Sequence, residues 1–166
     1  MAAASSFDVT STVDLQEVDN AINQARKEVV QRYDFKGSCA AIEFNKAENT
    51  LTLVADDNFK MDALWDILQT RLIRRNVPVK NMKLGDIEPA AGSTVRRVVT
   101  MQQGIPSDAA REIVKFLKDQ KLKKVQASIQ GEQLRISSPS KDELQDAIRV
   151  LRDRDFGIAL QFGNYR

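Results

Sequence analysis

The chain has 166 residues, of which 42% are hydrophobic, which is enough for one compact core or two small ones. Its 25 basic and 23 acidic residues give a formal net charge of +2, which permits a polyanionic partner without requiring one. The absence of histidine and the single cysteine, Cys39, exclude histidine-based catalytic triads, histidine-liganded zinc and an internal disulfide.

The sequence carries no signal for export or membrane insertion. Its first ten residues have neither a basic nor a long apolar segment, and no later stretch approaches the roughly 18 apolar residues of a membrane span. An unpaired cysteine suits a reducing compartment. We therefore expect a soluble, cytoplasmic protein with no membrane partner. Because the acidic residues form no recognisable metal-ligand pattern, we expect no metal and no cofactor.

The first half of the chain is predicted to alternate strands and helices. Polar and apolar residues alternate before Asp14 and helical spacing follows it, so Asp14, with Glu17 three positions later, is expected to cap a helix. Pro78 ends the next stretch of helical spacing. The predicted elements are strand 7–13, helix 15–32, hairpin strands 40–44 and 51–54, helix 61–74, an edge strand 79–84 and a loop or linker 88–93.

The second half repeats this order. Ser107 or Asp108 is expected to cap its first helix, and Ser140, with Glu143 three positions later, forms a capping box for its second. The hairpin residues predicted to face the core are Val125, Ala127, Ile129, Leu134 and Ile136. The predicted elements are strand 94–101, a helix through 110–117, hairpin strands 123–129 and 133–137, a helix through 144–151 and a last strand 160–165.

The element order β-α-β-β-α-β therefore occurs twice, which predicts an α+β protein with two ferredoxin-like βαββαβ domains. Each domain would be an antiparallel sheet with two helices on one face, leaving the other face free for water or a partner. The hairpin-to-helix passages of the two halves align. The matching core residues are Leu51, Leu53, Leu64, Ile67 and Leu68 in the first half and Leu134, Ile136, Leu144, Ala147 and Ile148 in the second.

Basic residues gather around the first helix of the second half. Arg111, Lys115 and Lys118 share the side of that helix opposite its apolar stripe, and Lys123 and Lys124 extend the group toward the hairpin. Two interpretations fit this pattern, a solvated helix face and a surface that binds phosphates.

Arginines and the single cysteine elsewhere in the chain are further candidates for chemistry. Arg135, on the polar face of the hairpin, can contact a phosphate or a guanine edge, stack on a base, or pair across strands with a residue such as Glu132. Arg96 and Arg97 are strand neighbours and point to opposite faces, so one of them can point inward, and an inward arginine needs an anionic partner or a ligand. Cys39 has no histidine to activate it, and no acid–base pair stands at a telling spacing, so we expect no enzymatic activity.

Several short motifs, taken together and in order over essentially the whole chain, resemble the bacterial YajQ family. Any one of them is weak evidence, whereas the set is specific. They are Arg32-Tyr33-Asp34-Phe35-Lys36-Gly37, Gln103-Gly104-Ile105, Gln126-Ala127-Ser128-Ile129-Gln130-Gly131, Asp142-Glu143-Leu144-Gln145 and the ending Leu160-Gln161-Phe162-Gly163-Asn164-Tyr165-Arg166.

The resemblance implies a small nucleotide-binding protein without established catalytic activity, associated with cyclic di-GMP and with RNA as an alternative ligand. It also implies that two ferredoxin-like domains exchange strands, so that 7–13 completes the second sheet and 94–101 the first. The domains would then be 14–103 and 104–166, the latter completed by 7–13. Arg32 and Lys36 of the first motif join the candidate nucleotide contacts.

The sequence departs from the family pattern at two loops. Ser137-Ser138-Pro139 stands where the family commonly has a Thr-Gly-Lys type run, and Gln102 stands where a lysine usually precedes Gln103. These departures predict a weaker phosphate site at the loops, or one elsewhere. Our leading hypothesis is a non-enzymatic regulator that binds cyclic di-GMP, GTP or ATP on basic residues of the second domain or between the domains. The alternatives are an RNA-binding module and an adaptor for a regulatory protein.

Overall fold

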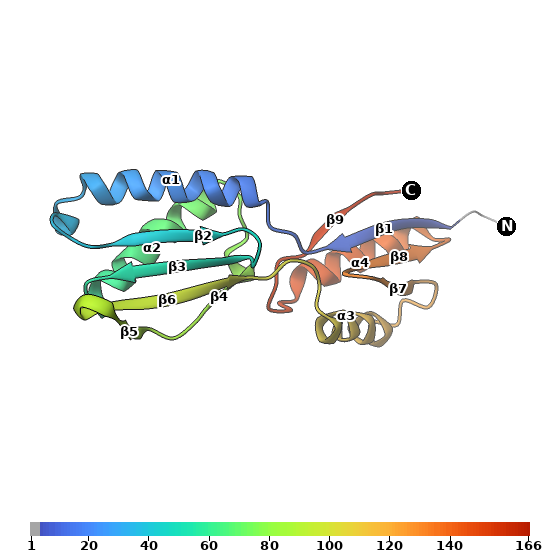
Figure 1. Ribbon diagram of the computed structural model, residues 1–166. Coiled ribbons are helices and arrows are strands. Elements are labelled where there is room, and N and C mark those ends of the chain that lie inside the picture. Colours follow the sequence, from blue (N-terminus) through green and yellow to red (C-terminus); the bar gives the residue numbers. More distant parts are fainter. Residues whose placement is uncertain (1–3) are drawn as a thin grey trace. The chain divides into compact units, whose positions relative to one another are not determined.

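The computed structural model describes residues 4–166, which divide into two compact units. The central unit is Val13–Gln102, and the terminal unit combines residues 4–12 with Gln103–Arg166. Each unit consists of one antiparallel sheet and two helices (Figure 1). Across the described residues, no helix has both the length and the apolar character needed to cross a bilayer.

In the central unit, α1 (Leu15–Gln31) and α2 (Asn58–Arg74) pack on one face of a sheet with the strand order β2-β3-β6-β4. Alternate residues of β3, Leu51 and Leu53 among them, are fully buried against these helices. The strands are β2 (Ala41–Asn45), β3 (Thr50–Ala55), β4 (Met82–Leu84), β5 (Glu88–Ala90), which pairs with β6 beyond the end of β4, and β6 (Thr94–Met101). Short 3₁₀ helices occupy Tyr33–Phe35, Val79–Asn81 and Ala91–Ser93.

The terminal unit repeats this arrangement with a smaller core. Its helices are α3 (Ser107–Asp119) and α4 (Lys141–Asp153), and Phe7, Leu134 and Ile136 are buried beneath them. The sheet order is β7-β8-β1-β9. The strands are β1 (Ser5–Thr10), β7 (Gln126–Gln130), β8 (Gln133–Ser138) and β9 (Gln161–Gly163).

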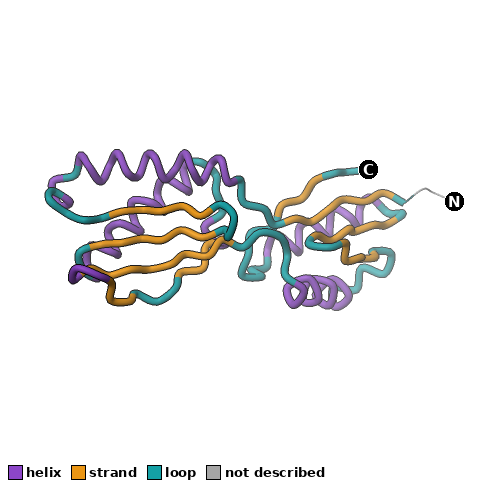
Figure 2. The backbone as a smooth tube through the Cα atoms, viewed as in Figure 1, coloured by secondary structure: helices purple, strands orange, loops and turns teal. Residues whose placement is uncertain are grey.

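One interior strand of each sheet belongs, in sequence order, to the other β-α-β-β-α-β repeat. β1 precedes α1 in sequence, yet it lies between β8 and β9, and β6 precedes α3, yet it lies between β3 and β4 (Figure 2). With these two strands in place, both sheets have the strand order of a ferredoxin-like domain. The predicted duplicated α+β ferredoxin-like fold is confirmed, and the strand exchange implied by the resemblance is present.

A side chain caps three of the four helices. The Asp14 carboxylate accepts from the backbone N–H groups of Gln16 and Glu17, and the Ser140 hydroxyl accepts from that of Glu143 at 3.3 Å. Asp57 caps α2. The prediction that Ser107 or Asp108 caps α3 is wrong: the helix begins at Ser107, so Pro106 occupies the capping position and offers no side-chain acceptor.

Two other local predictions are also wrong. Ile129 is 49% exposed rather than buried, because β7 is the outermost strand of its sheet. The segment predicted as a loop before Thr94 contains β5, which pairs with β6 in the register Glu88 to Arg96. The Arg96 guanidinium forms an ion pair with Glu88 at 3.4 Å across this ladder.

Candidate functional site

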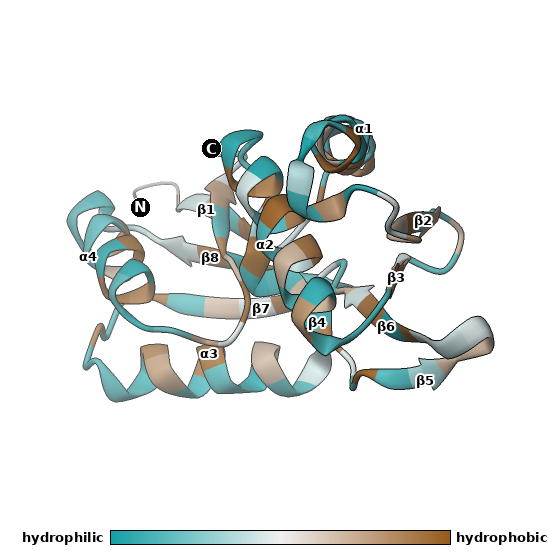
Figure 3. Cartoon of the chain, turned by 90° about the vertical axis from the view of Figure 1, so that its left-hand side faces the viewer, coloured by the Kyte–Doolittle hydropathy of each residue, from teal (hydrophilic) through white to brown (hydrophobic). Residues whose placement is uncertain are grey.

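The predicted basic residues of α3 lie on its outer face. Arg111, Lys115 and Lys118 are all exposed, opposite the buried Ile113 and Leu117, and Figure 3 shows hydrophilic and hydrophobic residues alternating along this helix. Lys123 and Lys124 are exposed in the loop that leads from α3 to β7. The structure therefore gathers these five cations along α3 and the start of β7.

Arg135 lies on the opposite, helix-free face of the same sheet. Its Nε donates to Oδ1 of Asp8, its neighbour across the ladder, at 3.1 Å. The Oδ2 atom of Asp8 accepts from the Asn164 side-chain amide at 2.6 Å. The cross-strand partner of Arg135 is thus Asp8 and not Glu132. Because successive strand residues face opposite sides, Arg135 cannot join the cations of α3 in one site.

The hydrogen bond from Asn164 holds the pKa of Asp8 below its ordinary value; burial opposes this shift, and Arg135 and Arg166 add to it. A group with a lowered pKa stabilises the fold at pH values above its unfolded pKa, near 4, and this stabilisation disappears as the pH falls through the folded pKa. We expect Asp8→Asn to destabilise the terminal unit by about 1–2 kcal/mol at pH 7 and by less at pH 3, where the unfolded carboxyl group is largely protonated.

Urea unfolding followed by the backbone amide signals of Leu134 and Ile136 measures this difference at both pH values. The exposed carboxylate of Asp119 provides the control, because Asp119→Asn removes one charge from the same unit without touching the Asp8 network. An equal cost of Asp8→Asn at the two pH values would contradict the assignment.

Arg32 and Lys36 lie in the central unit. Arg32 is already engaged: its guanidinium pairs with Asp34 at 2.8 Å and with Glu28 at 3.5 Å, and it lies over the ring of Phe35. Lys36 is exposed. Arg32 would have to give up two carboxylates to bind an anion.

The two neighbouring arginines of β6 point to opposite faces, as predicted. Arg97 faces the helices, where it lies opposite the buried Leu53. Its Nε is buried and has no hydrogen-bond partner among the described residues. The anionic partner expected for an inward arginine is therefore not found at this Nε atom among the described residues. The Arg97 side chain as a whole is only half-buried.

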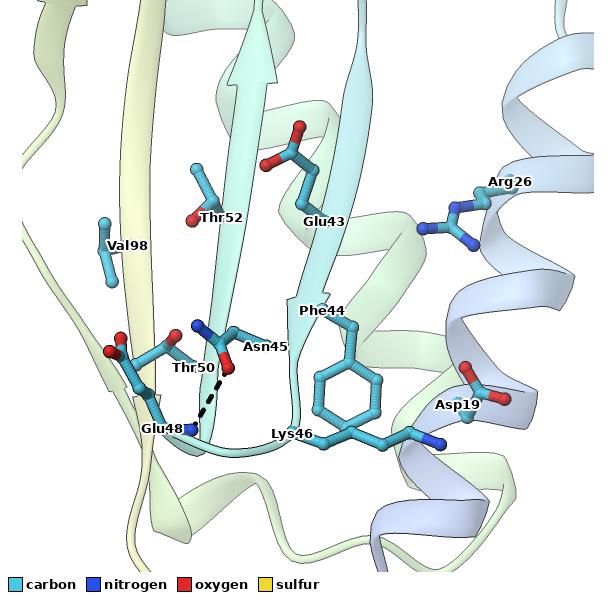
Figure 4. A pocket seen from close by; sticks show the side chains of 10 residues that line it. All are labelled: Asp19, Arg26, Glu43, Phe44, Asn45, Lys46, Glu48, Thr50, Thr52 and Val98. Atoms are coloured by element: carbon cyan, nitrogen blue, oxygen red, sulfur yellow. Dashed lines mark hydrogen bonds between the residues drawn. The ribbon is translucent and has the colours of Figure 1, made fainter.

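A pocket of about 750 Å³ wraps around the edge strand β2 of the central unit (Figure 4). Three carboxylates line it, from Asp19, Glu43 and Glu48, against the two cations Arg26 and Lys46. This net negative lining repels phosphate groups. Among the described residues, no group of three or more Cys, Asp or Glu side chains is placed to hold a metal ion.

A smaller pocket of the terminal unit combines an aromatic ring, an apolar floor and two cations. We call it the C-terminal pocket; its volume is about 270 Å³. Tyr165 is 61% exposed although its ring lies 6.2 Å from that of the buried Phe7. Lys141 and Arg166 are exposed at the rim. The lining residues are Ser5, Ser6, Phe7, Lys141, Leu144, Gln145, Ile148, Tyr165 and Arg166.

A β-bulge after β9 places the last two residues in this pocket. Gly163 pairs with Asp8, but the next backbone pair joins Arg166 to Ser6, with N···O distances of 2.9 and 3.2 Å in the two directions. The extra residue, Asn164, has φ 54°, a left-handed conformation that asparagine tolerates. The bulge turns Asn164 toward Asp8 and Tyr165 toward Phe7, so the tyrosine is fixed by backbone pairing on both sides.

This arrangement suits a planar ring that carries an anionic group. An exposed tyrosine over an aliphatic floor can stack on one face of a ring, and a lysine and an arginine at the rim can bind a phosphate. The hydroxyl groups of Ser5 and Ser6 add neutral donors and acceptors. Lys141 stands in the first turn of α4, directly after the capping residue Ser140.

Comparison with known proteins places this chain in a family. Residues 5–166 match the family described as nucleotide-binding protein YajQ-like. The chain belongs to the YajQ family. Proteins named nucleotide-binding protein in Koribacter versatilis and Solibacter usitatus are each 51% identical to it, over 99% and 97% of this chain and 98% and 96% of their own. One from Desulfitobacterium hafniense is 48% identical over the full length of both chains.

The pocket of this YajQ protein was not predicted from its sequence. The ending Leu160–Arg166 contributed to the family resemblance, but Tyr165 and Arg166 were not among the candidate site residues. The sequence feature that could have indicated this pocket is the aromatic Tyr165 directly followed by the basic Arg166. Lys141 follows the Ser137-Ser138-Pro139 loop closely, so a cation remains near the helix start despite the loop's departure from the family pattern.

Proposed function

We propose that this protein is a non-enzymatic nucleotide-binding regulator that takes a purine nucleotide in the C-terminal pocket. The observation that supports this most strongly is the combination of the exposed Tyr165 ring with Lys141 and Arg166 around an apolar floor. Its relatives are named nucleotide-binding proteins, which supports the broader class of nucleotide ligands. Cyclic di-GMP is the leading candidate, with GTP and ATP as alternatives.

In the proposed complex the base stacks on Tyr165 and the phosphate lies between Lys141 and Arg166. Stacking of a base on an aromatic side chain contributes about 1–3 kcal/mol. Arginine adds a planar pair of donors that fits a phosphate. At about 270 Å³ the pocket is small for a nucleotide site. A cyclic dinucleotide would therefore place one of its two bases inside and leave the other at the surface.

None of the eight residues first proposed for nucleotide contact lines this pocket. They stay predictions, and they fall in three separate places. Arg135 lies on the open sheet face, Arg32 and Lys36 lie in the central unit, and the others lie along α3 and its following loop. The two proposals can be separated by mutation because they share no side chain.

We expect Tyr165→Ala to weaken nucleotide binding about tenfold, since the variant loses the stacking surface and keeps both cations. Tyr165→Phe keeps the ring and should bind within about twofold of the wild type. Isothermal titration calorimetry with cyclic di-GMP, GTP and ATP measures both variants.

Lys141→Gln removes one of the two cations of the pocket and should also weaken binding. Lys27→Gln, at an exposed lysine of α1 in the other unit, makes the same change in net charge and should not. If none of the three ligands produces a heat of binding at millimolar concentration, small-nucleotide binding is refuted. A loss of binding in Lys118→Gln but not in Tyr165→Ala would move the site to α3.

RNA binding on the open sheet face of the terminal unit is the second candidate. Arg135 donates a hydrogen bond from Nε to Asp8, and its two terminal nitrogens have no partner among the described residues. They stand on a face of hydroxyl and amide side chains, including Ser128 and Ser137. This face lacks the aromatic residues on which single-stranded RNA usually stacks. Filter binding of mixed RNA over a salt series tests it, because phosphate-only binding collapses with salt whereas specific nucleotide binding persists.

A further inference from the structure

β7 is an edge strand that lacks the usual protection. It is the outermost strand of the terminal sheet, and its five residues, Gln126–Gln130, include no charge and no proline. Natural edge strands commonly carry lysine, proline or a bulge, which discourage pairing with another chain. The loop Gly131-Glu132 joins β7 to β8 with only two residues, so Gln130 and Gln133 form the closing pair. Ala127 and Ile129 then direct their backbone N–H and C=O groups to the open edge.

A groove runs beside this edge, between β7 and α3. Its volume is about 290 Å³, and Val114 and Leu117 of α3 form one wall while Val125 and Ala127 form the other. The exposed Ile129 continues the apolar surface along the strand. A strand added next to β7 would direct every second side chain toward α3, and the side chains nearest this groove would enter it.

Cations surround the groove. Lys118 lines it, and Lys115 and Arg111 follow on the exposed face of α3. Lys123 and Lys124 precede the strand. Residues 107–126 contain six basic and three acidic side chains, and one of the acids, Glu112, pairs with Arg154 at 3.1 Å. The charge that flanks this uncharged strand is therefore strongly positive.

We infer that the β7 edge binds an extended, acidic segment of another protein by strand addition. Its backbone pairs with Ala127 and Ile129. On the side of the added strand that faces α3, apolar side chains enter the groove and carboxylates two residues away face Lys115 and Lys118. A second copy of this chain is a poor occupant, because pairing of two β7 strands brings the same cations together. RNA fits poorly as well, because the groove is aliphatic and offers no ring for stacking.

Binding of a labelled peptide tests this inference on the full chain. The probe is an extended peptide of the repeat Val-Thr-Glu-Thr, which places valine and glutamate in turn on one face of the strand, and the comparison peptide has lysine in place of glutamate. We expect the acidic peptide to bind at least about tenfold more tightly in fluorescence anisotropy, with an advantage that shrinks as salt is added. In amide NMR spectra the shifts should fall on Val125–Gln130 and on α3. Equal binding of the two peptides, or shifts confined to other strands, would overturn the proposal.

Ala127→Pro tests strand addition directly. The outward N–H of an edge residue can be replaced by proline without loss of a ladder hydrogen bond, but the proline removes a donor from any added strand. We expect peptide affinity to fall about tenfold or more while nucleotide binding in the C-terminal pocket is unchanged. Undiminished peptide binding by a folded Ala127→Pro protein would refute strand addition.

Charge reversal provides a test that does not depend on the folding of that variant. The double substitution Lys115→Glu and Lys118→Glu changes only exposed side chains, and it should reverse the preference from the acidic to the lysine peptide. Lys27→Gln, in the other unit, should leave the preference intact. A preference that survives the reversal would overturn the inference, as would a β7-mediated dimer in sedimentation or an RNA that shifts the same amides with higher affinity.

Discussion

A fragment that begins at Val13 is expected to keep a folded central unit and to lose the terminal one. The segment removed contains β1, which pairs with both β8 and β9 in the interior of the terminal sheet. Phe7 and Val9 are buried in that core, at 1% and 0% exposure. Without β1, β9 has no strand partner and β8 exposes an unpaired edge. The central unit loses nothing, because all its strands lie between Val13 and Gln102.

Amide hydrogen exchange distinguishes the two units in one experiment. Protection should disappear from β8 and α4 in the fragment and persist in β3 and α2. A peptide of residues 4–12, added in excess, should restore part of the lost protection because it supplies the missing strand in trans. The fragment Val13–Gln102 is the matched control and should unfold cooperatively by itself. Full protection of Leu134 and Ile136 in the truncated chain would contradict this account.

The sequence was sufficient wherever local patterns control the structure. Asp14 and Ser140 were recognised as caps because each side chain bonds to N–H groups only two or three residues away. The matched passages Leu51–Leu68 and Leu134–Ile148 were recognised as core because apolar residues recur there with the periods of a strand and then a helix. All ten residues predicted to face the core in these passages are buried.

The same patterns could not show where a strand lies in its sheet. Ile129 follows the alternation of an inward residue, yet it is half-exposed because β7 is an edge strand. The strand exchange is invisible for a related reason: Phe7 and Val9 alternate in the same way whichever sheet they complete. Only the family resemblance implied the exchange, since strand pairing over more than 100 residues leaves no local signal.

The C-terminal pocket was not predicted, because a β-bulge shifts the two-residue period of the last strand by one position. Side chains after the bulge therefore lie on the face opposite to the one that the period predicts. Phe162 packs against the core, so a period of two would place Asn164 on the core face and Tyr165 on the open face. The extra residue at Asn164 exchanges these directions. The pocket also depends on residues from β1 and α4, which are distant in sequence. Charge patterning pointed instead to α3, where cations gather on a helix surface without an aromatic partner.

The core of the central unit provides the sharpest test of side-chain direction. Leu53 is fully buried under the helices, and its neighbour Val54 lies half-buried on the opposite face of β3. We expect Leu53→Ala to lower the free energy of unfolding by about 3–4 kcal/mol, because it removes buried surface and leaves a cavity.

Val54→Ala removes a similar kind of side chain one position away and should cost less than about 1 kcal/mol, because its surroundings already include water. Trp65, the only tryptophan of the chain, packs against this core and not that of the terminal unit. Its fluorescence in urea therefore follows the unfolding of the central unit alone.

Val99 of β6 lies opposite Leu51 in the same buried layer. The loss in free energy of unfolding from Val99→Ala should therefore exceed that from Val54→Ala, and it should be smaller than that from Leu53→Ala because valine is the smaller side chain. A cost for Val54→Ala that equals that of Leu53→Ala would mean that β3 is buried on both faces.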